Sequence, residues 1–223
     1  MKRSRIVNFE ELENELKETG LIVLGNYKIG TDDEYLKGFA TLLLLGPDEP
    51  RFWTIFKKSY EFSHIKRNPL DEWSKRTITA LANKFGGKPF FPFENNPTLP
   101  FYHWAIQSDY IWASPIKLLV HSSRGLMVSF RGALAFKQNL HLDKTISENI
   151  KRPCNTCSSP CFTACPVEAL TPEHYDAEKC GKFIRTAEGN VCREGCLVRR
   201  SCPVGQSLRQ KEQSRFHMQA FLK

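Results

Sequence analysis

The sequence has no long apolar run. The longest, Leu42 to Leu45, is far shorter than the ~20 residues that a membrane-spanning helix needs. Residues 1–11 also lack the apolar core of a secretory signal peptide. We therefore expect a cytoplasmic protein without a membrane span, in a compartment where thiols stay reduced and disulfides are rare.

Several motifs of known chemistry are missing as well. Gly86-Gly87 is not part of a Gly-x-Gly-x-x-Gly motif or a P-loop, so no phosphate-binding loop is predicted. The six histidines show no pairing at metal-ligand spacing and are expected at the surface or hydrogen-bonded in the core. The net charge of +8 only weakly indicates nucleic acid, because solvated basic faces are common on soluble proteins.

Helices and short apolar strands alternate in the first part of the chain. Residues 8–19 predict a helix with Asn8 as its N-cap and Gly20 as its stop, and residues 71–85 predict a second helix. Residues 20–25 and 39–45 predict buried strands.

Further elements are expected between these and the cysteines. Residues 50–62 and 99–107 predict helices, and the proline-rich residues 88–100 predict loop or extended chain. Residues 116–120 and 126–136 predict two strands joined by a turn. The expected fold class is α+β: an α/β reductase-like domain over residues 1–145, then a mostly helical ferredoxin-type domain with a C-terminal helix over residues 146–223.

Cysteine is absent from the first 153 residues, and all eight cysteines lie between Cys154 and Pro203. The first group, which ends at Cys165-Pro166, has the spacing C-x2-C-x3-C-x3-C-P. The second group is looser: Cys180 stands alone, and C-x3-C-x5-C-P follows from Cys192. Such a concentration of thiols in a reducing compartment predicts metal ligands rather than disulfides.

The first group resembles the bacterial ferredoxin run, in which three cysteines hold one [4Fe-4S] cluster and the fourth holds the other. Applied here, this crossed ligation predicts two sets of four cysteines. Set I is Cys154, Cys157, Cys161 and Cys202. Set II is Cys165, Cys180, Cys192 and Cys196.

Two other interpretations of the cysteines are open. Four-cysteine zinc sites also use C-x2-C spacing, and buried thiols can be inert. The paired Cys-Pro endings and the count of eight favour iron. We therefore predict an electron-transfer protein of the ferredoxin type, with two [4Fe-4S] clusters and a redox protein as electron donor or acceptor.

The cysteine pattern resembles that of the epoxyqueuosine reductases, which share features with corrinoid-dependent reductive dehalogenases. This family also has a tight group ending in Cys-Pro, a lone cysteine after a helix, and a third group ending in Cys-Pro. Four further segments are similar to helices and strands of this family and occur in the same order: residues 15–25, 39–45, 71–85 and 118–132. The chain looks like a shortened and divergent member.

The resemblance implies an alternative function. The protein would be an oxidoreductase assisted by cobalamin or by a flavin such as FMN, with the clusters as an internal electron relay. Its substrate would be a nucleoside or another small molecule, and nucleic acid (tRNA) would be a partner only under this alternative. Glu94, in Glu94-Asn-Asn-Pro97, is the nearest match to the family's acidic proton donor, and a solvated carboxylate is the other interpretation. The family's glycine-rich corrinoid stretch corresponds to residues 107–113, which contain no glycine, so a cofactor cannot approach this backbone as closely.

Overall fold

A computed structural model describes residues 6–30, 33–140, 150–208 and 210–222. The chain forms two compact units, residues 1–110 with 129–149 and residues 111–128 with 150–223. The domain boundary predicted at residues 145 and 146 lies outside the described residues. Residues 111–128, which precede it, nevertheless belong to the second unit.

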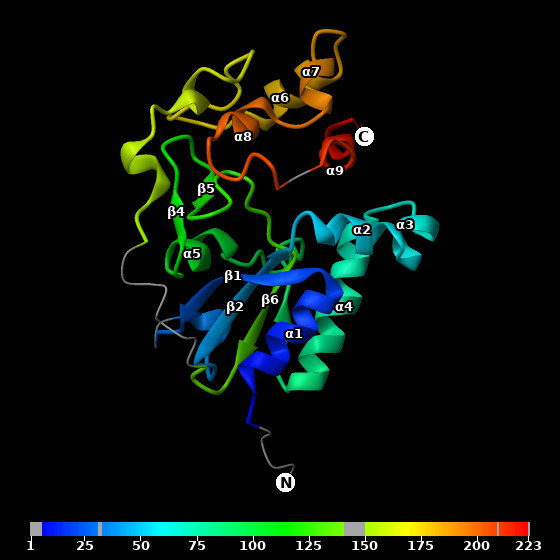
Figure 1. The fold of residues 1–223 in the computed structure, drawn as a ribbon, viewed down its shortest axis with the longest axis vertical. Coiled ribbons are helices and arrows are strands. Elements are labelled where there is room, and N and C mark those ends of the chain that lie inside the picture. The colour runs from blue at the N-terminus through cyan, green and yellow to red at the C-terminus, as the bar shows by residue number, and fades with distance from the viewer. Residues whose placement is uncertain (1–5, 31–32, 141–149, 209, 223) are drawn as a thin grey trace. The chain divides into compact units, whose positions relative to one another are not determined.

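The first unit contains a four-stranded sheet in the order β1-β2-β6-β3 (Figure 1). Its strands are β1 (Leu21–Lys28), β2 (Thr41–Pro47), β6 (Gly132–Phe136) and β3 (Lys88–Phe90). Every neighbouring pair is antiparallel. The four leucines 42–45 are fully buried, so both faces of β2 are covered, as a continuous apolar strand requires.

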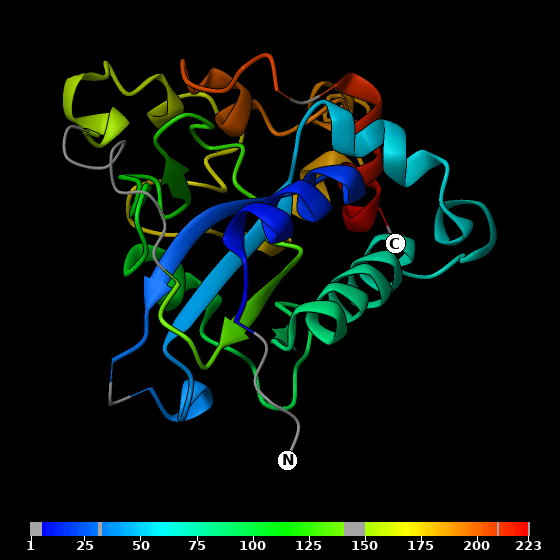
Figure 2. The ribbon, with the colours of Figure 1, turned by 60° about the horizontal axis from the view of Figure 1, so that its bottom comes forward.

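Helices α1 (Phe9–Thr19) and α4 (Pro69–Phe85) pack together beside this sheet (Figure 2). The predicted caps of α1 are confirmed: the Asn8 side chain accepts a hydrogen bond from the backbone N–H of Glu11, and Gly20 adopts a left-handed conformation. The helix α5 (Phe101–Ile106) contributes the buried Trp104, whose ring nitrogen donates a hydrogen bond to Asp33. A 3-10 turn, η1 (Glu34–Leu36), follows Asp33.

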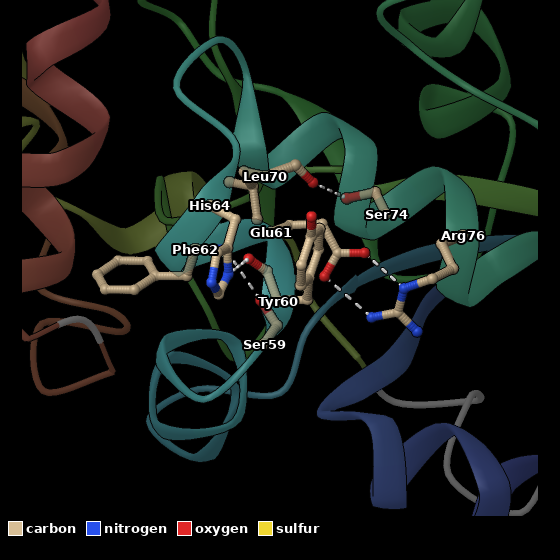
Figure 3. Close-up of polar contacts among 8 residues, drawn as sticks. All are labelled: Ser59, Tyr60, Glu61, Phe62, His64, Leu70, Ser74 and Arg76. Carbon is tan, nitrogen blue, oxygen red and sulfur yellow. Dashed lines mark hydrogen bonds and ion pairs between the residues drawn. The ribbon is translucent and has the colours of Figure 1, made fainter.

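Residues 50–62, predicted as one helix, form two: α2 (Arg51–Lys57) and α3 (Tyr60–His64). The break occurs because the Ser59 hydroxyl accepts a hydrogen bond from the backbone N–H of Phe62 and so caps a new helix. Glu61 then faces Arg76 on α4, and the two side chains form an ion pair (Figure 3).

The second unit begins with a two-stranded antiparallel hairpin, β4 (Ile111–Ala113) and β5 (Leu119–His121). Short helices follow, coloured yellow to red in Figure 1. They are η3 (Pro153–Thr156), η4 (Pro160–Phe162), α6 (Ala177–Ile184), α7 (Asn190–Arg193), α8 (Leu197–Ser201), α9 (Lys211–Met218) and η5 (Gln219–Phe221).

The mixture of helices with small antiparallel sheets is an α+β fold, as predicted. The strand predicted over residues 126–136 is shorter, since only Gly132–Phe136 joins the sheet and residues 126–128 belong to the second unit. The turn predicted at His121–Gly125 is present, closed by a β-bridge between those two residues. No helix among the described residues is long and apolar enough to cross a membrane.

Candidate metal centre

The four cysteines of set I come together around one hollow. Cys154 lies in η3, Cys161 lies in η4, and Cys202 follows directly after α8. The hollow contains about 390 Å³ of space between atoms, its mouth to solvent included. Water molecules could fill only about 20 Å³ of it, which is roughly the room of one water. The fourth member, Cys157, lines the same hollow.

The thiols of set I are close enough to affect one another's ionisation. Burial raises the pKa of Cys161, and the neighbouring Cys154, Cys157 and Cys202 raise it further. Burial also raises the pKa of Cys154, against the opposing positive charge of Arg152. Cys154 and Cys161 therefore stay protonated at neutral pH in the metal-free protein, and a bound metal would have to displace those protons.

The cysteines of set II gather in the same way. Cys180 lies in α6, Cys192 in α7 and Cys196 just before α8, while Cys165 ends the first cysteine group. Burial raises the pKa of Cys180 to about 11, with further contributions from the other three members of the set. Burial likewise raises the pKa of Cys192, followed by the effects of Cys196 and Cys165.

Backbone donors point at one sulfur in each set. The N–H of Ser159 donates to Cys157 Sγ at 3.4 Å, and Ser159 adopts a left-handed φ of 57° to do so. The N–H of Ala169 donates to Cys165 Sγ at 3.2 Å. Hydrogen bonds of this kind stabilise a thiolate over a thiol, and around iron–sulfur clusters they tune the reduction potential.

The helix α8 joins the two sets. Cys196 of set II precedes its first residue, and Cys202 of set I follows its last. Val198 between them is buried in a core that also contains Cys161 and Cys202, and Cys165 and Cys196 pack against it. The two sets are thus neighbours within one unit.

Comparison with known proteins adds no relative. No family model, curated protein or solved structure matches the chain. The chemistry of the site therefore has to be argued from its own geometry.

All eight thiols are free, and none takes part in a disulfide. Among the described residues, no group of three or more His, Cys, Asp or Glu is placed to hold a single metal ion. The four set I cysteines line a shared hollow. Their donor chemistry fits a soft metal, because thiolates select iron–sulfur clusters or zinc.

Glu94 belongs to the first unit. It is half-buried in the loop after β3, and its backbone N–H bonds to the carbonyl of Phe91 at 3.4 Å. The following Asn95, Asn96 and Pro97 are exposed. The catalytic role suggested for Glu94 by the family resemblance stays a prediction.

Sequence reasoning missed the contribution of residues 111–128 to set I. Ser114, Pro115, Val120 and Leu126 line the hollow with the cysteines. Arg152, two residues before Cys154, donates a hydrogen bond to the carbonyl of Ala113. The turn glycine Gly125 was the one local signal, since a glycine at a tight turn often marks close approach of another backbone.

Proposed function

We propose that this protein is an iron–sulfur electron-transfer protein that binds two [4Fe-4S] clusters, one at set I and one at set II. The observation that carries the proposal is the grouping of the eight cysteines. Cys154 and Cys202, although distant in sequence, lie close enough for Cys202 to raise the pKa of Cys154, and this supports a crossed ligation like that of two-cluster ferredoxins.

A single zinc ion and a cluster would require different spacings of the set I thiols. Four sulfurs around one zinc would lie about 3.8 Å apart, given Zn–S bonds of about 2.3 Å in a tetrahedron. A cluster that brings its own iron and sulfide occupies the centre of a wider ring of thiols.

The residues of this chain would perform three tasks. The eight cysteines would bind as thiolates after losing their protons. The N–H groups of Ser159 and Ala169 would stabilise the charge on two of the sulfurs. The apolar wall, which includes Val120 and Leu126, would limit water at set I. The bound clusters would supply reversible one-electron chemistry.

The partner under this proposal is a redox protein that donates or accepts single electrons. The first unit, which we propose to be related to the corrinoid-binding domain of the epoxyqueuosine reductases, would help to dock that partner or to shield a cluster. The cellular location proposed for this exchange is the cytoplasm, where the thiols would stay reduced before metal insertion.

Anaerobic reconstitution with iron and sulfide tests the proposal. We expect broad visible absorption from sulfur-to-iron charge transfer and about four irons for each set of cysteines. Stoichiometric zinc in the freshly purified protein, together with no iron uptake on reconstitution, would favour a structural zinc module instead.

One observation in the first unit favours a second function, a cobalamin- or flavin-assisted reductase. A hollow of about 880 Å³, its mouth to solvent included, is lined by Gln107 together with Tyr27, Asp33, Tyr35 and His103. Gln107 begins the stretch that corresponds by resemblance to the family's corrinoid-binding glycines. Titration with cob(II)alamin and with FMN tests this alternative. Binding tighter than micromolar favours the reductase, and an unchanged cofactor spectrum favours electron transfer alone.

A further inference from the structure

The segment 111–128 is tied to the cysteine-bearing chain by two arginines. Arg152, just before set I begins, donates to the carbonyl of Ala113. Arg199 on α8 donates from Nη1 to the carbonyl of Leu126 at 2.6 Å and to that of Val128 at 3.1 Å. Hydrogen bonds from a charged donor are stronger than neutral ones. Both ends of the segment are therefore held against the chain that carries the cysteines.

The turn at Gly125 in this segment packs closely against the chain around Cys202. Gly125 has a φ of 54°, and a Cβ built on it would lie 2.7 Å from Cys202 Sγ and 2.1 Å from the carbonyl oxygen of Val204. A Cβ on Gly205 would lie 2.3 Å from the carbonyl oxygen of Arg124. The backbone around Gly125 and the backbone around Gly205 are therefore too close for a side chain at either glycine.

The backbone contact at Gly125 is made with Cys202 of set I. The segment supplies Ser114, Pro115, Val120 and Leu126 to the set I hollow. The core around Cys192, with Ile184 and Met218, is packed by residues from 180 onward. Cys165 and Cys196 of set II also pack against the core that contains Val120 and Leu126, but the close backbone contact lies at Cys202.

We infer that segment 111–128 is a structural part of the set I centre and that Gly125 is a positioning residue for Cys202. The inference rests on the proposed function for its metal, but the geometry concerns the thiol itself. Cys202 is the set I ligand that comes from far along the sequence, so its placement depends on what it packs against. Gly125 allows that packing because it has no side chain.

Gly125→Ala is the direct test, with Gly86→Ala as its matched control. Gly86 also has a positive φ, 71°, but a Cβ there meets nothing within 4 Å. Both variants carry the same backbone strain, and only Gly125→Ala displaces Cys202. After reconstitution we expect Gly125→Ala to hold about half the iron of wild type, since one of two clusters is lost. We expect Gly86→Ala to hold the wild-type amount.

A second measurement needs no metal. Cys202 and Cys192 are each 8% exposed, so Cys192 serves as an internal reference in the metal-free chain. Alkylation followed by peptide mass spectrometry should show a several-fold faster reaction of Cys202 in Gly125→Ala, with Cys192 unchanged. Equal acceleration of both thiols would indicate general unfolding and would overturn the inference.

Arg199 provides a milder variant. Arg199→Gln should load iron normally but lose the set I cluster several-fold faster in air, because the segment over the hollow is loosened. Arg199→Lys, which keeps a charged donor, should restore part of the protection. An unchanged rate of loss in Arg199→Gln contradicts the inference.

Failure of the inference and failure of the proposed function are distinguishable. If the wild-type protein and Gly125→Ala take up the same amount of iron, the role of Gly125 is contradicted and the proposal of two clusters still stands. Wild-type protein that takes up no iron removes the clusters, and the alkylation rates of Cys202 and Cys192 still decide the role of Gly125.

Discussion

The backbone N–H of Ala169 donates a hydrogen bond to Cys165 Sγ at 3.2 Å. The carbonyl of Ala169 accepts in turn from the N–H of Asp176 at 2.7 Å. Asp176 caps α6, which carries Cys180. One short loop therefore connects the last cysteine of the first group to the lone cysteine that follows, which supports the proposed assignment of Cys165 to set II.

Serine substitutions test this crossed grouping. Cys165→Ser and Cys202→Ser should each lower the iron content to about half, because each removes one ligand from a different cluster. The double variant with both changes should lose nearly all iron. Adding Cys180→Ser to Cys165→Ser should cost little more, since both belong to set II and effects within one site are not additive.

The iron content of each single and double variant is the measurement. If Cys154→Ser added to Cys165→Ser costs no further iron, those two residues share a cluster and the crossed assignment is wrong.

Tyr175 lies beside set II and is 46% exposed. It pairs with Leu170 in a β-bridge, and its pKa is raised by burial first and then by Cys180 and Cys196. We expect Tyr175→Ala to lose the set II cluster several-fold faster in air, because the Tyr175 ring would shield the sulfurs of Cys180 and Cys196 from solvent. Tyr175→Phe keeps the ring and should behave as wild type.

Phe162 offers the matched comparison for Tyr175. It is 44% exposed and directly follows Cys161 of set I. Phe162→Ala should affect the other cluster, as followed by visible and EPR spectra during exposure to air. The same cluster lost in both variants would contradict the placement of Tyr175 at set II.

The raised pKa of Cys180 predicts a pH dependence in the metal-free protein. With its pKa at about 11, the thiol is neutral at pH 7 and becomes the reactive thiolate only as the pH approaches that value. The rate of alkylation at Cys180 should therefore rise through pH 10. A midpoint near the ordinary cysteine pKa of about 8.5 would contradict the combined effect of burial and the neighbouring thiols on Cys180.

Glu61 and Arg76 predict a second pH effect, in the first unit. The Glu61 side chain is 7% exposed and bonds to the guanidinium of Arg76, which lowers the pKa of Glu61. A lowered carboxyl pKa contributes stability above the unfolded value of about 4.3, and this stability is lost as the pH falls through the folded pKa.

Glu61→Gln should lower the free energy of unfolding by about 1 kcal/mol at pH 7, less than a fully buried charged hydrogen bond contributes, because Arg76 is largely exposed. The difference from wild type should vanish below the folded pKa of Glu61. Glu18→Gln, in the exposed pair with Arg51, should change stability little at either pH. Denaturant titrations at pH 7 and pH 3 measure both variants.

The sequence predicted best those elements whose signals are local. Asn8 and Gly20 mark the ends of α1, and the leucines of β2 mark a buried strand. The break at Ser59 was missed because serine caps a helix only in one local conformation, which a continuous apolar pattern conceals.

Long-range placement was harder to predict. The spacing of the cysteines predicts two sets, because binding a metal would impose a pattern on the sequence, and this assignment stays a prediction. The contact between Gly125 and Cys202 has only a weak local signal, since the sequence does not distinguish a glycine that allows close approach from any other turn glycine. The contribution of segment 111–128 could therefore be seen only in the structure.

The most direct test of two clusters is the iron and acid-labile sulfide content of the wild-type chain after anaerobic reconstitution. The proposal predicts about eight of each per chain, because each [4Fe-4S] cluster holds four irons and four sulfides. It also predicts visible absorption that bleaches on reduction. Protein that stays colourless and takes up neither iron nor sulfide, while its eight thiols remain reduced, would contradict it.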